Sequence, residues 1–200
     1  MAEGVFITGT DTEVGKTLIA AGLVVALQDQ GIDVGVMKPL ESGAPSFEST
    51  PVPRDAFYLK EIADVQDDLD LINPYRFQAP LAPGVAAAKE GVEVDLQRIT
   101  AAYEELKGRH QFMVVEGAGG LLVPITKGTL FPELIKLLDL PLLVVARASL
   151  GTINHTLLTL SYCQQEGLAV KGLIMSKTTP DMDPSDRVAR VARRLELELV

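Results

Sequence analysis

The chain has 200 residues, of which 47% are hydrophobic and 5% aromatic, and its formal net charge is −9. This length and apolar content suit one folded domain with a substantial core, and they exclude a disordered chain. The acidic balance, with no cluster of Lys and Arg, argues against binding to nucleic acid.

Short apolar runs alternate with helical patterns along the whole chain. Such alternation predicts βαβ units and a parallel sheet. We therefore expect a single domain over residues 1–200, with an α/β fold that is doubly wound and has a mostly parallel sheet flanked by helices. The expected strands are 5–8, 33–38, 112–116, 142–146 and 170–175, and the expected helices are 16–30, 55–63, 95–107, 129–138 and 152–166.

Two stretches break this alternation. Residues 41–54 are rich in Ser, Pro and Gly, and residues 71–91 carry three prolines with little strand character. Long loops in a compact α/β domain are more often functional than idle. We predict that both stretches are loops.

The segment between the first strand and the first helix reads GTDTEVGKT at residues 9–17. In a P-loop, backbone N–H groups at a helix N-terminus point at phosphate oxygens. Lys16 would reach the β- and γ-phosphates, and the Thr17 hydroxyl would ligate Mg²⁺. The first glycine is Gly9 and lies one position earlier than in the strict pattern, but the flanking strand and helix favour a P-loop over a chance turn. We therefore expect the domain over residues 1–200 to be P-loop NTPase-like.

Three further residues lie where predicted strands or helices open onto the same crevice. Lys38 ends the second strand, with Ser42 nearby, and can neutralise an anionic substrate or a transferred phosphoryl group. Glu116 closes the third strand and is followed by glycines, the place of a carboxylate that holds Mg²⁺ in P-loop proteins. Asp55 is a second possible metal ligand, and it is equally suited to be the N-cap of its helix.

A fourth feature follows the strand at 142–146. Arg147 lies close to a helix N-terminus in the segment LGTINH at residues 150–155. Free N–H groups and an arginine suit a bound carboxylate. An ordinary capped helix remains the alternative.

With these residues in view, the sequence resembles the dethiobiotin synthetases. The matching segments are GTDTEVGKT, KPLESG at 38–43, VEGAGG at 115–120 and LGTINH, in the same order and at similar spacing. The resemblance covers about residues 4–176. It implies a homodimeric, Mg²⁺-dependent enzyme of biotin biosynthesis that closes the ureido ring of dethiobiotin from 7,8-diaminononanoate, CO₂ and ATP or another nucleoside triphosphate.

The resemblance also implies a role for each matching position. Lys16 and Lys38 would be catalytic, and Thr17, Asp55 and Glu116 would hold the metal. The nucleotide would be bound by Thr12, Glu13, Val14, Gly15, Lys16, Thr17 and Ser176. The diamine would contact Thr12, Lys38, Ser42, Gly117, Ala118 and Gly119, and its carboxylate would be held by Leu150, Gly151, Thr152, Ile153 and Asn154 of the partner subunit.

Ser176 departs from the family pattern, because many relatives carry there an asparagine that reads the nucleotide base. Members of the family also usually continue beyond the last residue of this chain. We therefore expect weak selectivity for adenine.

The alternative function is that of a partition-type regulatory P-loop ATPase. Those proteins place a signature lysine early in the P-loop, where this chain has Asp11. They also often carry a basic or amphipathic surface, which this acidic chain lacks.

Two other features concern the location of the protein. The single cysteine, Cys163, excludes an intramolecular disulfide, and its apolar helical setting favours a buried side chain over a nucleophile. The N-terminus lacks a signal-peptide pattern, and no apolar run is long enough to span a bilayer. We expect a cytoplasmic protein that binds no membrane.

Overall fold

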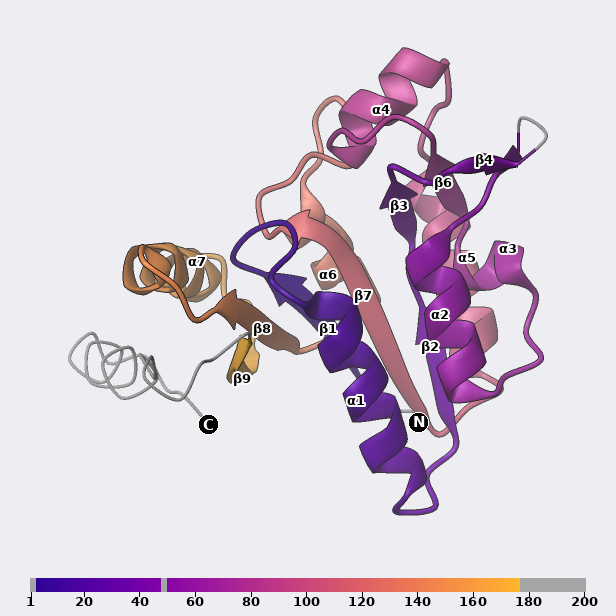
Figure 1. Cartoon of the computed structure of the whole chain (residues 1–200), viewed down its shortest axis with the longest axis horizontal. Coiled ribbons are helices and arrows are strands. Elements are labelled where there is room, and N and C mark those ends of the chain that lie inside the picture. Colours follow the sequence, from indigo (N-terminus) through magenta and orange to yellow (C-terminus); the bar gives the residue numbers. More distant parts are fainter. Residues whose placement is uncertain (1–2, 48–49, 177–200) are drawn as a thin grey trace.

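A computed structural model describes residues 3–47 and 50–176, and these contain a five-stranded sheet in which every pairing is parallel (Figure 1). The strand order is β2-β7-β1-β8-β9. The prediction of a doubly wound α/β fold with a mostly parallel sheet is confirmed. The five strands are β1 (Glu3–Gly9), β2 (Val34–Met37), β7 (Phe112–Gly120), β8 (Leu142–Arg147) and β9 (Val170–Ser176).

Helices cover both faces of this sheet. Figure 1 shows α1 and α2 in front of it, and α5 and α6 behind it. Because both faces are covered, β2 is buried at every residue, which explains why the strands read as short continuous apolar runs. The helices are α1 (Lys16–Gln28), α2 (Arg54–Ala63), α3 (Leu69–Ile72), α4 (Pro83–Glu90), α5 (Leu96–Lys107), α6 (Phe131–Leu138) and α7 (Thr152–Gln165).

The prediction of two long loops was wrong. Within these stretches, β3 (Leu40–Ser42) pairs in parallel with β6 (Tyr75–Phe77), and β4 (Ser46–Phe47) pairs with β5 (Thr50–Pro51) in an antiparallel hairpin. Strands of two or three residues are too short to show a period of two, so their sequences did not reveal them. Figure 1 shows α4 above the carboxyl ends of the central strands.

Helix α4 also lies in a stretch predicted to be a loop. Its sequence PGVAAAKE has few large apolar residues, so its periodicity is weak. The residues at the two ends of α4 are nevertheless typical of helix termini. Pro83 lies in the first turn and Gly91 ends the helix with φ 69°, the asymmetry that is typical of helix termini.

One smaller expectation is confirmed. The Cys163 side chain is buried, and that burial raises the pKa of its thiol to about 12, so it is a core residue. Among the helices that the structure describes, none is long and apolar enough to cross a bilayer.

Candidate functional site

The P-loop folds back on itself between β1 and α1. Lys16 is the first residue of α1, and its Nζ donates a hydrogen bond to the Asp11 carbonyl oxygen at 3.1 Å. Gly15 has a φ of 100°, a conformation that glycine adopts without strain, and it precedes the free N–H groups of the helix. The loop therefore presents backbone donors and an ammonium group to one space, as phosphate binding requires.

The structure explains why the first glycine of the motif is at position 9. A Cβ atom at this position would lie 2.8 Å from the Val14 Cγ2 atom and 2.9 Å from the Asp11 carbonyl oxygen. The loop thus packs so tightly against the end of β1 that only glycine fits. The tight turn begins at residue 9 rather than at residue 10.

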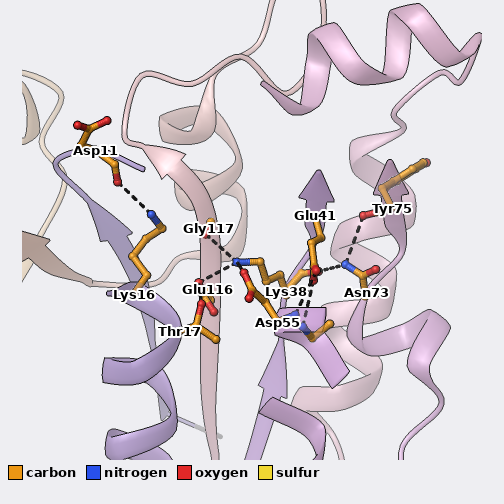
Figure 2. A network of polar contacts seen from close by, with 11 residues as sticks. Asp11, Lys16, Thr17, Lys38, Glu41, Asp55, Asn73, Tyr75, Glu116 and Gly117 are labelled. Carbon is orange, nitrogen blue, oxygen red and sulfur yellow. Dashed lines mark hydrogen bonds and ion pairs between the residues drawn. The ribbon is translucent and has the colours of Figure 1, made fainter. Parts of the chain in front are cut away.

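Glu116 lies at the centre of the site, in the strand that neighbours β1. Its side chain is buried, and its Oε1 accepts hydrogen bonds from the Thr17 hydroxyl at 2.9 Å and from the Lys38 Nζ at 2.7 Å (Figure 2). Its Oε2 is buried without a hydrogen-bond partner. A buried carboxylate oxygen left in this state is costly unless a bound cation satisfies it.

Lys38 is held from several sides. Its ammonium lies 2.7 Å from Glu116 and 3.0 Å from the Asp55 carboxylate, and its side chain is only 3% exposed. Its backbone is also fixed, because the Asn73 amide donates to the Lys38 carbonyl oxygen at 2.6 Å. The strand-end lysine is therefore a fixed, buried cation rather than a solvated surface charge.

The two lysines differ in their protonation. Burial lowers the pKa of Lys16 to about 8, and the nearby charge of Lys38 adds to this effect. Burial alone would also lower the pKa of Lys38, but the ion pairs with Glu116 and Asp55 outweigh it and raise that pKa above its ordinary value. Lys38 is the permanent positive charge of the site, and Lys16 is the one that responds to pH.

Asp55 is not the N-cap of its helix, so that alternative was wrong. Helix α2 begins at Arg54, its N-cap is Pro53, and Asp55 lies in the first turn. The backbone N–H groups of Asp55 and Ala56 donate instead to the Glu41 carboxylate, at 3.1 and 3.0 Å. This arrangement leaves the Asp55 carboxylate free to face Lys38.

A pocket of about 380 Å³ joins these groups. Nearly all of the predicted site residues of the P-loop, of the Lys38 segment and of the Glu116 segment line it, together with Asp55. Glu41 also lines it and was missed as a site residue, although it stands inside the KPLESG segment. The lining residues are Thr12, Glu13, Gly15, Lys16, Thr17, Lys38, Glu41, Ser42, Asp55, Glu116, Ala118 and Gly119.

The donor set fits a magnesium ion. Mg²⁺ prefers one or two carboxylates, a hydroxyl, waters and substrate phosphates. The Thr17 hydroxyl, the partnerless Oε2 of buried Glu116 and the half-exposed carboxylate of Asp55 supply such oxygens. Among the described residues, no group of three or more His, Cys, Asp and Glu side chains is arranged to hold a metal alone, so a metal here would also need phosphate oxygens or water.

Other predicted residues do not line the pocket. The Gly117 carbonyl oxygen accepts a 3.4 Å hydrogen bond from Lys38, and Val14 is buried beneath the loop. The Ser176 hydroxyl donates to the Val14 carbonyl oxygen, so it supports the loop from behind. The guanidinium of Arg147 lies 3.4 Å from the Asp11 carboxylate, and is thus directed at the P-loop rather than only at the start of α7.

The segment at 150–154 lies outside the pocket of its own chain. Leu150 is 99% exposed, and α7 begins without a side-chain cap after Gly151. The hydroxyl of Thr152 is buried with no hydrogen-bond partner. The predicted role of this segment in a partner subunit is therefore not visible within one chain.

Comparison with known proteins gives concordant findings. A family model described as an AAA domain matches residues 3–200. The ATP-dependent dethiobiotin synthetase BioD of Anaeromyxobacter dehalogenans (strain 2CP-1) is 48% identical, with 98% of this chain and 89% of that protein covered. The enzyme of the same name from Bacillus licheniformis is 43% identical, with 90% and 80% covered.

Solved structures agree on the fold. The MinD cell division protein of Aquifex aeolicus superposes with a TM-score of 0.56 at 20% identity, covering 99% of this chain and 80% of that one. A ParA family ATPase from Chlorobium tepidum gives a TM-score of 0.54 at 19% identity, covering 95% and 81%. At such identities the likeness concerns the fold alone. The extent and level of sequence identity with the BioD proteins show that the chain belongs to the ATP-dependent dethiobiotin synthetase family, whose members are ligases of biotin biosynthesis.

Proposed function

We propose that the protein uses ATP to close the ureido ring of dethiobiotin from 7,8-diaminononanoate and CO₂. The observation that carries this proposal is the buried Lys38 beside a P-loop, in a pocket that is also lined by the carboxyl end of β7. The second fixed cation of this site is Lys38, directly after β2, whereas the position of the partition-type signature lysine in the P-loop holds Asp11. The name shared by the relatives supports the same reaction.

The proposed reaction has three steps. One amine of the substrate adds to CO₂ and loses a proton, which gives a carbamate. A carbamate oxygen then attacks the γ-phosphorus as the bond to ADP breaks, and a carbamic-phosphoric mixed anhydride forms. The second amine attacks the carbonyl carbon, phosphate leaves with the bonding electrons, and the amine loses its proton to give the cyclic urea.

The residues of the pocket suit these steps because each step needs positioned charge rather than a covalent nucleophile. Lys38 is the permanent cation that would bind the carbamate and the oxygens of the transferred phosphoryl group. Lys16 and the N–H groups at the start of α1 would hold the β- and γ-phosphates. Lys38 is fixed by its ion pairs before substrate arrives, so it needs little reorganisation during the reaction.

A magnesium ion, when bound, would neutralise charge on the phosphates. Thr17, Glu116 and Asp55 would hold it. The diamine would lie along Ser42 and the glycine-rich end of β7, with Thr12 facing it from the P-loop. These residues orient the two amines toward the space between Lys38 and the phosphates.

The proposal predicts phosphate release that depends on the diamine. With Mg²⁺ and ATP, we expect release to rise at least about tenfold when diaminononanoate and bicarbonate are added, with one cyclic urea formed per phosphate. A partition-type ATPase would instead hydrolyse ATP at a rate indifferent to the diamine. Parallel assays with CTP and GTP test the expected weak selectivity for adenine, which strong exclusive use of ATP would contradict.

We also propose that the active unit is a homodimer in which residues 150–154 of one subunit bind the diamine carboxylate in the other. Support comes from apolar side chains that a monomer would leave in water, since Leu150 is 99%, Leu158 64% and Leu122 50% exposed. The start of α7 offers free N–H groups for a carboxylate.

The dimer proposal predicts the effect of Leu150→Glu. A charge in the apolar interface should give monomers by light scattering, and diamine-dependent turnover should fall about 100-fold because the carboxylate site is lost. Leu137→Glu is the control, since Leu137 is 57% exposed on α6 and lies outside the proposed interface. A Leu150→Glu protein that is monomeric and fully active would contradict the shared site.

A further inference from the structure

Glu41 is a buried carboxylate for which the proposed reaction gives no direct role. Its side chain is 5% exposed, and it lies in β3 between Lys38 and the pocket wall formed by Ser42. A buried carboxylate is costly unless it is hydrogen-bonded or paired. Its partners therefore indicate what it does.

These partners are two backbone N–H groups in the first turn of α2, those of its second and third residues. The N-cap residue Pro53 has no side-chain oxygen to accept them, and the structure shows no side-chain cap of the usual kind there. Glu41 Oε1 accepts from the Asp55 N–H at 3.1 Å (Figure 2). Glu41 Oε2 accepts from the Ala56 N–H at 3.0 Å. A carboxylate at this place satisfies orphan donors and interacts favourably with the helix dipole.

The same two hydrogen bonds fix the residue that would serve the metal. Asp55 donates its own backbone N–H to Glu41, while its carboxylate lies 3.0 Å from Lys38 and is 45% exposed. A half-exposed side chain keeps one direction only if its backbone is held. Glu41 supplies that hold from β3, which begins two residues after Lys38 in the sequence.

We propose that Glu41 is a positioning residue: it clamps the first turn of α2 to β3 and so keeps the Asp55 carboxylate beside Lys38, in place for a divalent cation. This inference rests on the proposed function of the pocket. We assign Glu41 to positioning rather than to metal ligation because each of its oxygens accepts a hydrogen bond from the first turn of α2, at 3.1 and 3.0 Å. Substitution of a residue that holds a metal ligand in place typically lowers metal affinity by about 10- to 100-fold.

The test measures cation binding directly. We would titrate Mn²⁺ into the full-length protein with a non-hydrolysable ATP analogue, follow free Mn²⁺ by electron paramagnetic resonance, and subtract the Mn²⁺ that the analogue binds without protein. Glu41→Ala should weaken Mn²⁺ binding about tenfold, and Glu41→Gln, which keeps one acceptor oxygen, about threefold. In turnover assays the Mg²⁺ concentration for half-maximal rate should rise in proportion, while kcat at saturating Mg²⁺ stays within about twofold.

The matched control is Asp95→Ala. Asp95 caps α5 through a 2.8 Å hydrogen bond from the Gln97 N–H, and it does not line the pocket. Its loss should lower the melting temperature like the loss of any cap but leave Mn²⁺ binding unchanged. If Glu41→Ala behaves like Asp95→Ala in both measurements, Glu41 is only a helix cap and the proposal is wrong.

The experiment also separates failure of the proposed function from failure of the positioning role of Glu41. Should Glu41→Ala fail to fold, Glu41→Gln decides the question, because it keeps the side-chain volume and lacks the charge. A wild-type protein that binds Mn²⁺ with nucleotide but shows no diamine-dependent turnover contradicts the proposed function and leaves the Mn²⁺ comparison valid. A wild-type protein that binds no Mn²⁺ in the presence of the nucleotide overturns the positioning role of Glu41.

Discussion

Replacing Lys38 by alanine is expected to lower kcat for ring closure by about 1000-fold. The ammonium is the permanent cation beside the P-loop, and removing one preorganised charge that stabilises a transition state typically costs about 100- to 1000-fold. The measurement is cyclic urea formation at saturating substrates. Ring closure that survives unimpaired would contradict the synthetase mechanism.

The same substitution should also destabilise the fold, and a second variant separates the two effects. Lys38→Ala leaves the buried Glu116 carboxylate without its cation, which costs about 3–5 kcal/mol of unfolding free energy. The double variant Lys38→Met/Glu116→Gln removes both charges, and the glutamine oxygen can still accept from Thr17. We expect it to recover most of the stability in urea unfolding while activity stays lost.

An exposed lysine provides the control for Lys38. Lys136 also forms an ion pair, with Glu166 at 2.7 Å, but its side chain is 46% exposed. Solvent screens such an exposed pair, so Lys136→Ala should leave stability and turnover nearly unchanged. A large effect of Lys136→Ala would show that loss of a lysine in general, rather than loss of the buried cation, explains the Lys38 result.

Replacing Lys16 by methionine is expected to lower kcat by about 1000-fold and to abolish proton uptake on ATP binding. Burial lowers the pKa of Lys16 to about 8, so the wild-type side chain is about half protonated at pH 8. Bound triphosphate favours the charged form and raises this pKa again. Wild-type protein should therefore take up about half a proton per bound ATP at pH 8.

Calorimetry of ATP binding in two buffers of different ionisation enthalpy measures this uptake. The sign follows from the protonation states: the complex holds the proton, so ATP affinity should fall as pH rises above 8, by at most about tenfold per pH unit. Below pH 7 the uptake should vanish, because Lys16 is already charged. Equal uptake by wild-type protein and Lys16→Met would assign the proton to another group.

The nucleotide loop and the ends of the central strands could be predicted because their signals are local. The loop needs Gly9, Gly15 and Lys16 at fixed spacing, and each buried strand is one continuous apolar run. The pairing of β3 with β6 joins three-residue strands that lie more than 30 positions apart in the sequence. No local sequence pattern predicts this pairing.

The role of Glu41 was hidden for a related reason. A helix cap is ordinarily sought in the residue that precedes the helix, and for α2 that reasoning pointed to Asp55 itself. The acceptor is instead supplied from 14 positions earlier, across the hairpin of β4 and β5. Contacts of this kind depend on tertiary placement, and composition and spacing do not encode them.

The strand order has a consequence for how the molecule is made. Strands β1 and β2 come first in the sequence, yet they do not pair with each other, because β7 lies between them. During synthesis on a ribosome, the first 111 residues therefore leave these two strands without their shared neighbour. Closing such distant pairings is slow, and open strand edges invite aggregation in the meantime. Lys38 gains its buried partner only when synthesis has reached Glu116, so the charged groups at the centre of the pocket are assembled late.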